Sequence, residues 1–213
     1  MFRVLIGALV IALGAPFPAL AGDTTLTTQP QTVLVGAQLG PNLFHVGAGV
    51  IIRASGSLTI VTAAHVVRDA KSITIQTAAG THLDVVGSTV FVPGHDLALV
   101  RTTLPEDGLH VATPDDQVAD NAPLYVWGHP HSKPFVLSEA HFLTENIKNA
   151  PGLFAITCPT CAVGDSGGGV FDQRGHLLGI VSKSAEDVGS ITGIVVAEPI
   201  GPALTAAGIA LNH

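Results

Sequence analysis

Short apolar runs recur along the chain from residue 47 onward, and glycine, proline, asparagine or serine bounds each run. Runs of this length, rich in valine and isoleucine, are typical of β-strands. In the first half of the chain the pattern predicts strands at 47–53, 57–64, 72–77, 82–92 and 96–101. In the second half it predicts strands at 123–128, 134–147, 153–158, 168–171, 176–182 and 191–197.

Residues 104–123 separate these two sets of strands. The segment is rich in proline, aspartate and glycine and has few periodic apolar positions, which predicts a linker between two halves. Only residues 199–211, which are rich in alanine and have an early proline, show helical spacing. Short strands without alternating helices predict an all-β fold built of antiparallel barrels or sandwiches.

The first 21 residues have the pattern of an export signal. Arg3 precedes an apolar or small run at 4–15 that is too short to span a bilayer comfortably, and Ala-Leu-Ala at 19–21 matches a signal-peptidase site. We expect residues 1–21 to be a signal peptide cleaved after Ala21, giving a secreted or periplasmic protein with no membrane association. The alternative is an uncleaved membrane anchor.

Composition limits the partners of the chain. Its 213 residues, 47% of them hydrophobic, suffice for one sizeable domain or two small packed cores. The formal net charge is −7 and lysine and arginine do not cluster, so we expect no nucleic-acid partner.

Two cysteines, Cys158 and Cys161, are separated by two residues. In an oxidising compartment we expect them to form a small-loop disulfide, with free thiols as the first alternative. A thioredoxin-like role would need a βαβ context, and zinc would need two further ligands. We therefore expect no metal and no cofactor.

The stretch GDSGGG places Ser166 among glycines at 164 and 167–169. A serine hydroxyl is a weak nucleophile that needs a neighbouring base and N–H donors for the oxyanion. Glycines allow a sharp turn and a close approach of substrate, so the amides of Gly164 and Ser166 could point into one small space.

The expected base is His65 in TAAHVV, where a buried strand ends in small residues and a short turn begins. The expected carboxylate is Asp96 in HDLALV, at the start of an apolar strand. Each residue alone would usually be structural, so the hypothesis rests on all three motifs occurring together.

These three segments closely resemble the signature segments of trypsin-like serine proteases with the chymotrypsin fold, and the chain order His, Asp, Ser is the same. The compact spacing resembles bacterial members such as glutamyl endopeptidases and high-temperature-requirement proteases. The resemblance covers about 47–197. It implies two antiparallel six-stranded β-barrels, an active site between them and a C-terminal helix.

The N-terminal pattern gives a signal peptide at 1–21. The resemblance implies three further segments: an N-terminal barrel at 22–113 carrying His65 and Asp96, a C-terminal barrel at 114–198 carrying Ser166, and a helix at 199–213. Because few residues follow the second barrel, we expect no PDZ-like domain.

The resemblance also implies site roles. His65 is the general base, Asp96 orients it and Ser166 is the nucleophile. Gly164 and Ser166 are the oxyanion donors, and Asp165 supports the turn between them. The predicted mature start, GDTTLTTQ, is unlike Ile-Val-Gly-Gly, so we do not expect a new N-terminus to insert beside Asp165.

Substrate binding is implied for the segment 179–184, with Ser182, Lys183 and Ser184 pairing with an extended peptide by strand addition. Thr160 resembles the base of the primary pocket and carries no charge. We therefore expect polypeptide substrates with a small or apolar residue before the scissile bond, and no strict preference for Arg or Lys.

Other interpretations stay open. The protein could be a non-catalytic peptide-binding module on a protease fold. An α/β-hydrolase esterase is disfavoured because no strand–turn–helix surrounds Ser166. We expect His129 and His131 beside Trp127 to form a polar loop rather than a metal site, and His95 to be a turn residue rather than a second base. The oligomeric state is not predicted.

Overall fold

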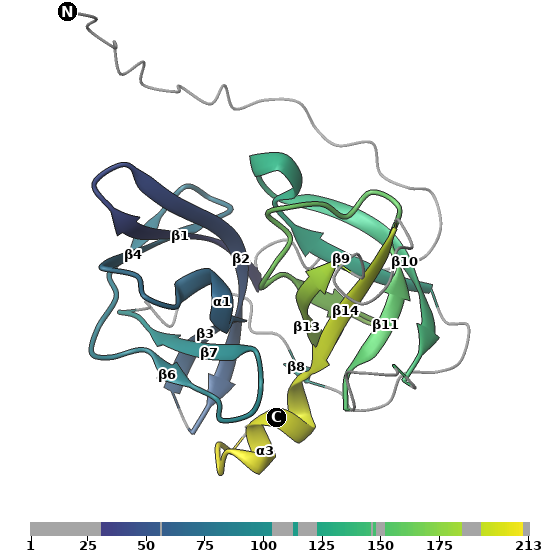
Figure 1. Ribbon diagram of the computed structural model, residues 1–213. Coiled ribbons are helices and arrows are strands. Elements are labelled where there is room, and N and C mark those ends of the chain that lie inside the picture. The colour runs from purple at the N-terminus through teal and green to yellow at the C-terminus, as the bar shows by residue number, and fades with distance from the viewer. Residues whose placement is uncertain are drawn as a thin grey trace, which may run out of the picture.

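A computed structural model describes residues 31–55, 57–103, 113–114, 123–145, 147, 152–184 and 193–210. In these ranges the chain forms two β-sheets of seven strands each that lie side by side (Figure 1). The pairings are antiparallel except for one short parallel pair. The prediction of an all-β fold built mainly of antiparallel strands is confirmed. The boundaries of the predicted segments stay a prediction.

The N-terminal sheet has the strand order β5-β4-β1-β2-β3-β7-β6. Its edges approach each other through the single bridge between Val85 and Thr102, so this sheet is strongly curved but is not closed by a continuous ladder. Its strands are β1 (Thr32–Gly40), β2 (Leu43–Ala54), β3 (Ser57–Ala63), β4 (Ser72–Thr77), β5 (His82–Leu83), β6 (Val90–Phe91) and β7 (Leu97–Arg101).

The C-terminal sheet has the order β12-β9-β10-β11-β14-β13-β8, and a further pairing of β12 with β13 closes six of these strands into a barrel. The remaining strand, β8, is the one that pairs in parallel, with the start of β13. Its strands are β8 (Thr113–Pro114), β9 (Pro123–Gly128), β10 (Val136–Thr144), β11 (Phe154–Thr157), β12 (Gly169–Phe171), β13 (His176–Ser184) and β14 (Ile194–Pro199).

Helical structure is short. Helix α1 (Ala64–Val67) follows β3 directly, and a 3-10 turn (Pro130–Ser132) follows β9. The C-terminal helix α3 (Ile200–Ala206) follows β14, as predicted from the alanine-rich tail. None of the helices in the described ranges is long and apolar enough to cross a bilayer.

Three apolar clusters form the core. One lies within the N-terminal sheet and a second within the C-terminal barrel. The third combines side chains of both halves, including Val50 and Ile52 of β2, Phe171 of β12, and Ile200 and Leu204 of α3. The two halves therefore share a buried interface, and α3 is part of it.

Two strand predictions were wrong in detail. Strand β1 was not predicted, although its side chains at Val33 and Val35 are fully buried. The predicted strand at 82–92 is broken into β5 and β6, because Gly87 between them has φ +70°, outside the extended region. The predicted signal peptide and most of the predicted linker lie outside the described residues.

Candidate active site

His65 lies on α1, at the point where β3 leaves the N-terminal sheet. The preceding residues Ala63 and Ala64 are fully buried, so the chain can turn tightly against the sheet while His65 remains about half exposed. The N–H of Ala64 donates to the carbonyl of Asp96 at 2.9 Å. This bond places the start of α1 directly beside the start of β7.

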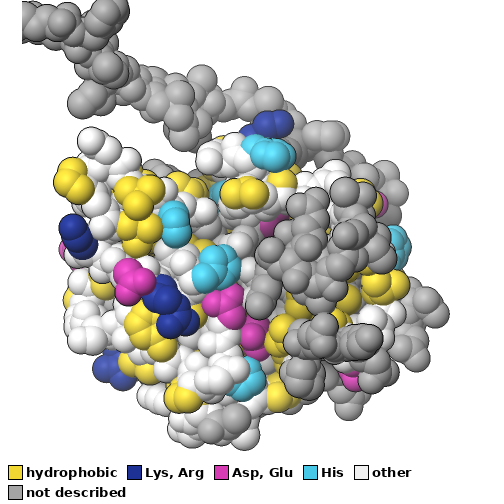
Figure 2. Space-filling model, in the orientation of Figure 1, with side chains coloured by type: hydrophobic (Ala, Val, Ile, Leu, Met, Phe, Trp, Pro, Cys, Tyr) yellow, Lys and Arg dark blue, Asp and Glu magenta, His cyan; other side chains and the backbone are white. Residues whose placement is uncertain are grey.

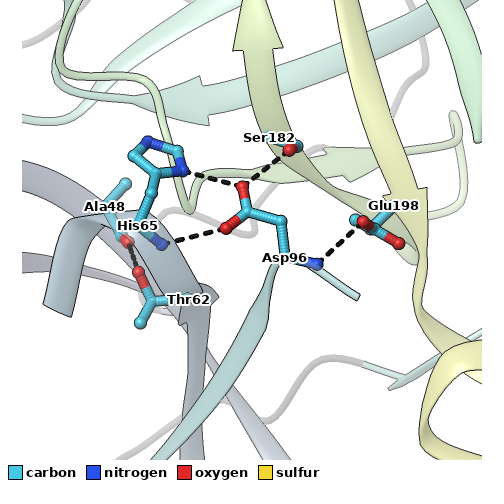
Figure 3. A network of polar contacts seen from close by, with 6 residues as sticks. All are labelled: Ala48, Thr62, His65, Asp96, Ser182 and Glu198. Atoms are coloured by element: carbon cyan, nitrogen blue, oxygen red, sulfur yellow. Dashed lines mark hydrogen bonds and ion pairs between the residues drawn. The ribbon is translucent and has the colours of Figure 1, made fainter. Parts of the chain in front are cut away.

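Asp96 accepts three hydrogen bonds through its carboxylate (Figure 3). The backbone N–H of His65 donates to Oδ1 at 2.9 Å, and Nδ1–H of the same residue donates to Oδ2 at 2.7 Å. The hydroxyl of Ser182, on β13 of the other sheet, also donates to Oδ2 at 2.7 Å. The carboxylate therefore fixes the imidazole ring from the N-terminal half and is itself held by the C-terminal half.

The surroundings of Asp96 keep it ionised. Burial raises the pKa of its carboxyl, but the hydrogen bonds from His65 and Ser182 and the charge of His65 outweigh burial, so the pKa lies below its ordinary value. An ionised carboxylate only accepts, so the ring proton of His65 is on Nδ1. In the neutral ring Nε2 is then free to accept a proton.

Ser166 lies in the turn between Cys161 and β12, and its carbonyl accepts the N–H of Ala48 of β2 at 2.8 Å. Its side chain is half-buried and lines the same cleft as His65 and Asp96. Within the described residues, the Ser166 hydroxyl makes no hydrogen bond to His65. In unliganded enzymes such contacts are often long and tighten only when substrate binds.

The backbone around Ser166 leaves two donors open. The N–H groups of Asp165, Gly167 and Gly168 donate to carbonyls of Ala162, Val181 and Asp165. Those of Gly164 and Ser166 donate to no acceptor in the part of the chain that the structure describes. This alternation leaves the two N–H groups predicted for an oxyanion hole available to a ligand.

Gly164 has to be glycine for this geometry. Its φ is +108°, and a Cβ at this position would collide with the carbonyl oxygen of His129. That carbonyl belongs to the loop after β9, whose residue His131 donates its N–H to Val163 at 2.7 Å. The loop after β9 therefore supports the turn that precedes Ser166.

Asp165 is 2% exposed and lies at the wall of the cleft, with Oδ2 accepting the N–H of Ala162 at 2.8 Å. Burial raises the pKa of this carboxyl to about 6, in spite of the bond from Ala162 and the nearby charge of His131. The carboxyl supports the turn through that hydrogen bond.

The cleft has a volume of about 1100 Å³ and lies between the two sheets. In Figure 2, histidine and acidic side chains gather near the middle of the face where the two halves meet. Besides Ser166, the C-terminal half contributes the polar residues His131, Asp165 and Ser182 to the lining. It also contributes a group of small or apolar residues, which are Pro159, Cys161, Ala162, Val163, Val181, Gly193, Ile194 and Val195.

The Cys158–Cys161 disulfide is present, so that prediction is confirmed. It closes the loop that carries Pro159 and Thr160. Cys161 lines the cleft, whereas Thr160 is exposed and is not among the described lining residues. Its role at the base of the primary pocket stays a prediction.

Strand β13 offers a free edge to the cleft. Lys183 and Ser184 pair with Val196 and Val195 of β14 on one side. Among the described strands, none pairs with the other side of residues 182–184. The predicted strand addition of a peptide at this edge stays a prediction, and Ser182 contributes in addition the hydroxyl that holds Asp96.

The histidines after Trp127 differ from each other. His131 lies in an exposed turn, as expected of a polar loop. His129 also lies in this loop but is fully buried, with Nδ1 accepting the N–H of Phe135 and Nε2 facing the carbonyl of Val33. Within the described ranges, no three His, Cys, Asp or Glu side chains are placed to hold a metal ion.

Sequence reasoning missed Glu198, which binds the backbone of Asp96. The available signal was a lone carboxylate at the end of an apolar strand, directly before Pro199. His95, predicted as a turn residue, does lie in the turn before β7, and its ring binds Glu198.

Comparison with solved structures supports the fold. The active form of the Rv3671c protease from M. tuberculosis superposes with a TM-score of 0.68 at 21% identity, covering 100% of this chain and 96% of that chain. The inactive form of the Rv3671c protease superposes with a TM-score of 0.70 at 21% identity, covering 93% of this chain and 100% of that chain. The serine endoprotease from Yersinia pestis superposes with a TM-score of 0.65 at 22% identity, covering 84% of this chain and 61% of that chain.

No curated protein sequence matches the chain significantly. The family model of the trypsin-like peptidase domain, however, matches residues 47–180, which run from within β2 to within β13 and include the three segments around His65, Asp96 and Ser166. Because this match covers more than half of the sequence, the chain belongs to the trypsin-like peptidase family, the serine proteases with the chymotrypsin fold.

Proposed function

We propose that this peptidase is an exported serine endopeptidase that cleaves polypeptides through an acyl-enzyme formed on Ser166. The observation that carries the proposal is the hydrogen bond of 2.7 Å between Nδ1 of His65 and Asp96, in the cleft that Ser166 also lines. A base with a fixed tautomer beside a serine and two open N–H donors is the arrangement that acyl transfer requires.

In the proposed reaction, the hydroxyl oxygen of Ser166 attacks the scissile carbonyl carbon while Nε2 of His65 takes the hydroxyl proton. Asp96 stabilises the imidazolium that forms, and the N–H groups of Gly164 and Ser166 donate to the oxyanion. The C–N bond then breaks as His65 returns the proton to the leaving amine. Water then attacks the ester carbonyl carbon while Nε2 of His65 takes its proton. The ester C–O bond breaks as His65 gives this proton to the oxygen of Ser166, and the carboxylic acid product leaves.

A fluorophosphonate probe, which reacts with activated serines, tests this assignment. We expect the wild type to be labelled and Ser166→Ala and His65→Ala to lose labelling and nearly all peptidase activity, with folding unchanged. Ser88→Ala, between β5 and β6, and His82→Ala, on β5, change exposed residues of the N-terminal half and are matched controls. Retention of most of the turnover in His65→Ala would contradict the assignment of the base.

We also propose that the residue before the scissile bond is small or apolar. The support is the lining next to Ser166, where Ala162, Ile194 and Val195 present no charge to a substrate side chain. Lys183 lies on the proposed substrate strand, but its side chain is outside the described residues. A peptide library in which most cuts followed Arg or Lys would contradict this preference.

Export is proposed from the signal pattern at 1–21, and the disulfide is compatible with an oxidising compartment. Intact-mass measurement of the exported protein is expected to show a chain that begins at Gly22. A mass that includes residues 1–21 would favour the membrane-anchor alternative.

A further inference from the structure

Glu198, the penultimate residue of β14, carries a carboxylate that is 4% exposed at the junction of the two sheets. Its Oε1 accepts the backbone N–H of Asp96 at 2.9 Å, and its Oε2 accepts Nδ1–H of His95 at 2.9 Å. Figure 3 shows Glu198 on the opposite side of Asp96 from His65.

A buried carboxylate at this position is costly unless its oxygens are hydrogen-bonded. The preceding residues of the strand, Val195, Val196 and Ala197, are buried and apolar, so a fourth apolar residue would suit the packing. Stability alone therefore does not explain Glu198. Both of its carboxylate oxygens bind residues of the turn that carries Asp96, namely Asp96 itself and His95.

Other hydrogen bonds hold the carbonyls of this turn: Ala64 donates to Asp96, His95 to Val92 and Val92 to Leu97. None of them satisfies the N–H of Asp96. Asp96 precedes the first paired residue of β7, Leu97, so its N–H takes no part in the sheet ladder. Within the described residues, the acceptor for this N–H is Glu198. The turn contains Gly94 at φ +80° and lines the cleft from Val92 to Asp96. Without Glu198, the N–H of Asp96 would lose this acceptor, and the backbone at Asp96 would be held only through its carbonyl and its side chain.

The contact also crosses between the two halves of the molecule. Strand β14 supplies Ile194 and Val195 to the apolar part of the cleft and Glu198 to the turn of Asp96. One strand thus fixes the distance between the surface that would bind the substrate side chain and the carboxylate that orients His65.

We propose that Glu198 is a positioning residue, which holds the backbone of Asp96 so that its carboxylate meets Nδ1 of His65. This inference rests on the proposed function. The orientation of the His65 ring then depends on two residues of the C-terminal half, Ser182 and Glu198. His95 is the partner that keeps the second oxygen of Glu198 in place.

A matched pair of substitutions separates this role from general stability. Glu198→Gln keeps an oxygen acceptor for the N–H of Asp96, whereas Glu198→Met keeps the length of the side chain but has no such acceptor. We expect Glu198→Gln to retain kcat within about threefold and Glu198→Met to lose kcat by tenfold or more, with KM within about twofold. Glu139→Met, at an exposed glutamate of β10, is the control and is expected to match the wild type.

A spectroscopic readout tests the position of the ring directly. The proton shared between Nδ1 of His65 and Asp96 is expected to give a downfield ¹H NMR resonance in the wild type and in Glu198→Gln, and to move upfield in Glu198→Met. A folded Glu198→Met variant with an unchanged resonance and kcat within twofold would overturn the proposal.

If Glu198→Met does not fold, amide hydrogen exchange of the wild type decides, because the proposal requires a protected N–H at Asp96. Rapid exchange there, at the rate of an exposed amide, would overturn it. The proposed function is tested separately: if it is wrong, the fluorophosphonate probe does not label the wild type.

Discussion

Asp96 is partly buried and Asp165 is buried beside the same cleft, and their surroundings shift their pKa values in opposite directions. Around Asp96, burial is outweighed by hydrogen bonds from His65 and Ser182, and the pKa is lowered. Around Asp165, burial outweighs the bond from Ala162, and the pKa rises to about 6. Hydrogen-bond donors therefore decide which carboxyl is charged in mildly acidic solution: Asp96 stays ionised, while Asp165 gains a proton near pH 6.

This difference predicts a pH-dependent effect of Asp165→Asn on stability. The pKa of Asp165 is raised on folding, so its contribution to stability is full below about pH 4 and is lost as the pH rises to about 6. Asparagine does not ionise, so the variant does not lose this stability. Between pH 4 and pH 6 its free energy of unfolding therefore rises relative to that of the parent, by about 3 kcal/mol at most. Thermal unfolding of both at pH 4 to 7, in a Ser166→Ala background that prevents self-digestion, measures the difference.

The matched control for that experiment is Asp84→Asn, because Asp84 is exposed. Its Tm difference from the parent is expected to stay constant across the same pH range. A constant Tm difference for Asp165→Asn as well would show that the buried carboxyl does not change its protonation between pH 4 and 7.

The disulfide loop between β11 and β12 connects two parts of the candidate site. Cys158 is fully buried and its N–H donates to the carbonyl of Gly193, directly before β14. Cys161 lines the cleft, and the N–H of the next residue, Ala162, binds the carboxylate of Asp165. The bridge therefore restrains the apolar wall of the cleft and the turn that precedes Ser166 together.

Removal of this bridge is expected to affect both parts. A loop of this size contributes about 2 kcal/mol in the chain-entropy account. For Cys158→Ala combined with Cys161→Ala, we expect a lower Tm and a kcat/KM for peptides with an apolar residue before the scissile bond that falls by about tenfold. Reduction of the wild type with a dithiol should reproduce the loss, and an unchanged kcat/KM in the reduced protein would contradict it.

Most of the strands and the three motifs could be predicted from the local sequence, because period-two apolar runs and turn residues depend on only a few neighbouring positions. Prediction from the local sequence failed for β1, where the buried positions Val33, Val35 and Ala37 alternate but Gly36 and Gly40 interrupt the apolar run. It also failed for Glu198, whose partner Asp96 is 102 residues away. A carboxylate at a strand end is usually solvated, and only the packing of the two sheets shows that this one is buried.

The candidate site exists only where the two halves of the molecule meet. Ser166 is carried by the C-terminal half, and His65 and Asp96 by the N-terminal half. Hydrogen bonds from Ala48 to Ser166, from Ser182 to Asp96 and from Asp96 to Glu198 cross between them. The shared apolar cluster, to which α3 contributes Ile200, Ala203 and Leu204, holds the halves at the distance these bonds require.

Two cavity-forming substitutions test whether this shared cluster sets activity. Leu204→Ala removes a fully buried side chain of α3 from it, and Ile75→Ala removes a similar side chain from the core of the N-terminal sheet alone. Each is expected to cost about 2–5 kcal/mol of stability. Because only Leu204 lies between the halves, we expect its truncation to lower kcat/KM by about tenfold at 25 °C in protein that is still folded, while Ile75→Ala leaves it near the wild-type value. Equal losses of kcat/KM in both variants would mean that stability in general, and not the placement of one sheet against the other, controls the arrangement of His65, Asp96 and Ser166.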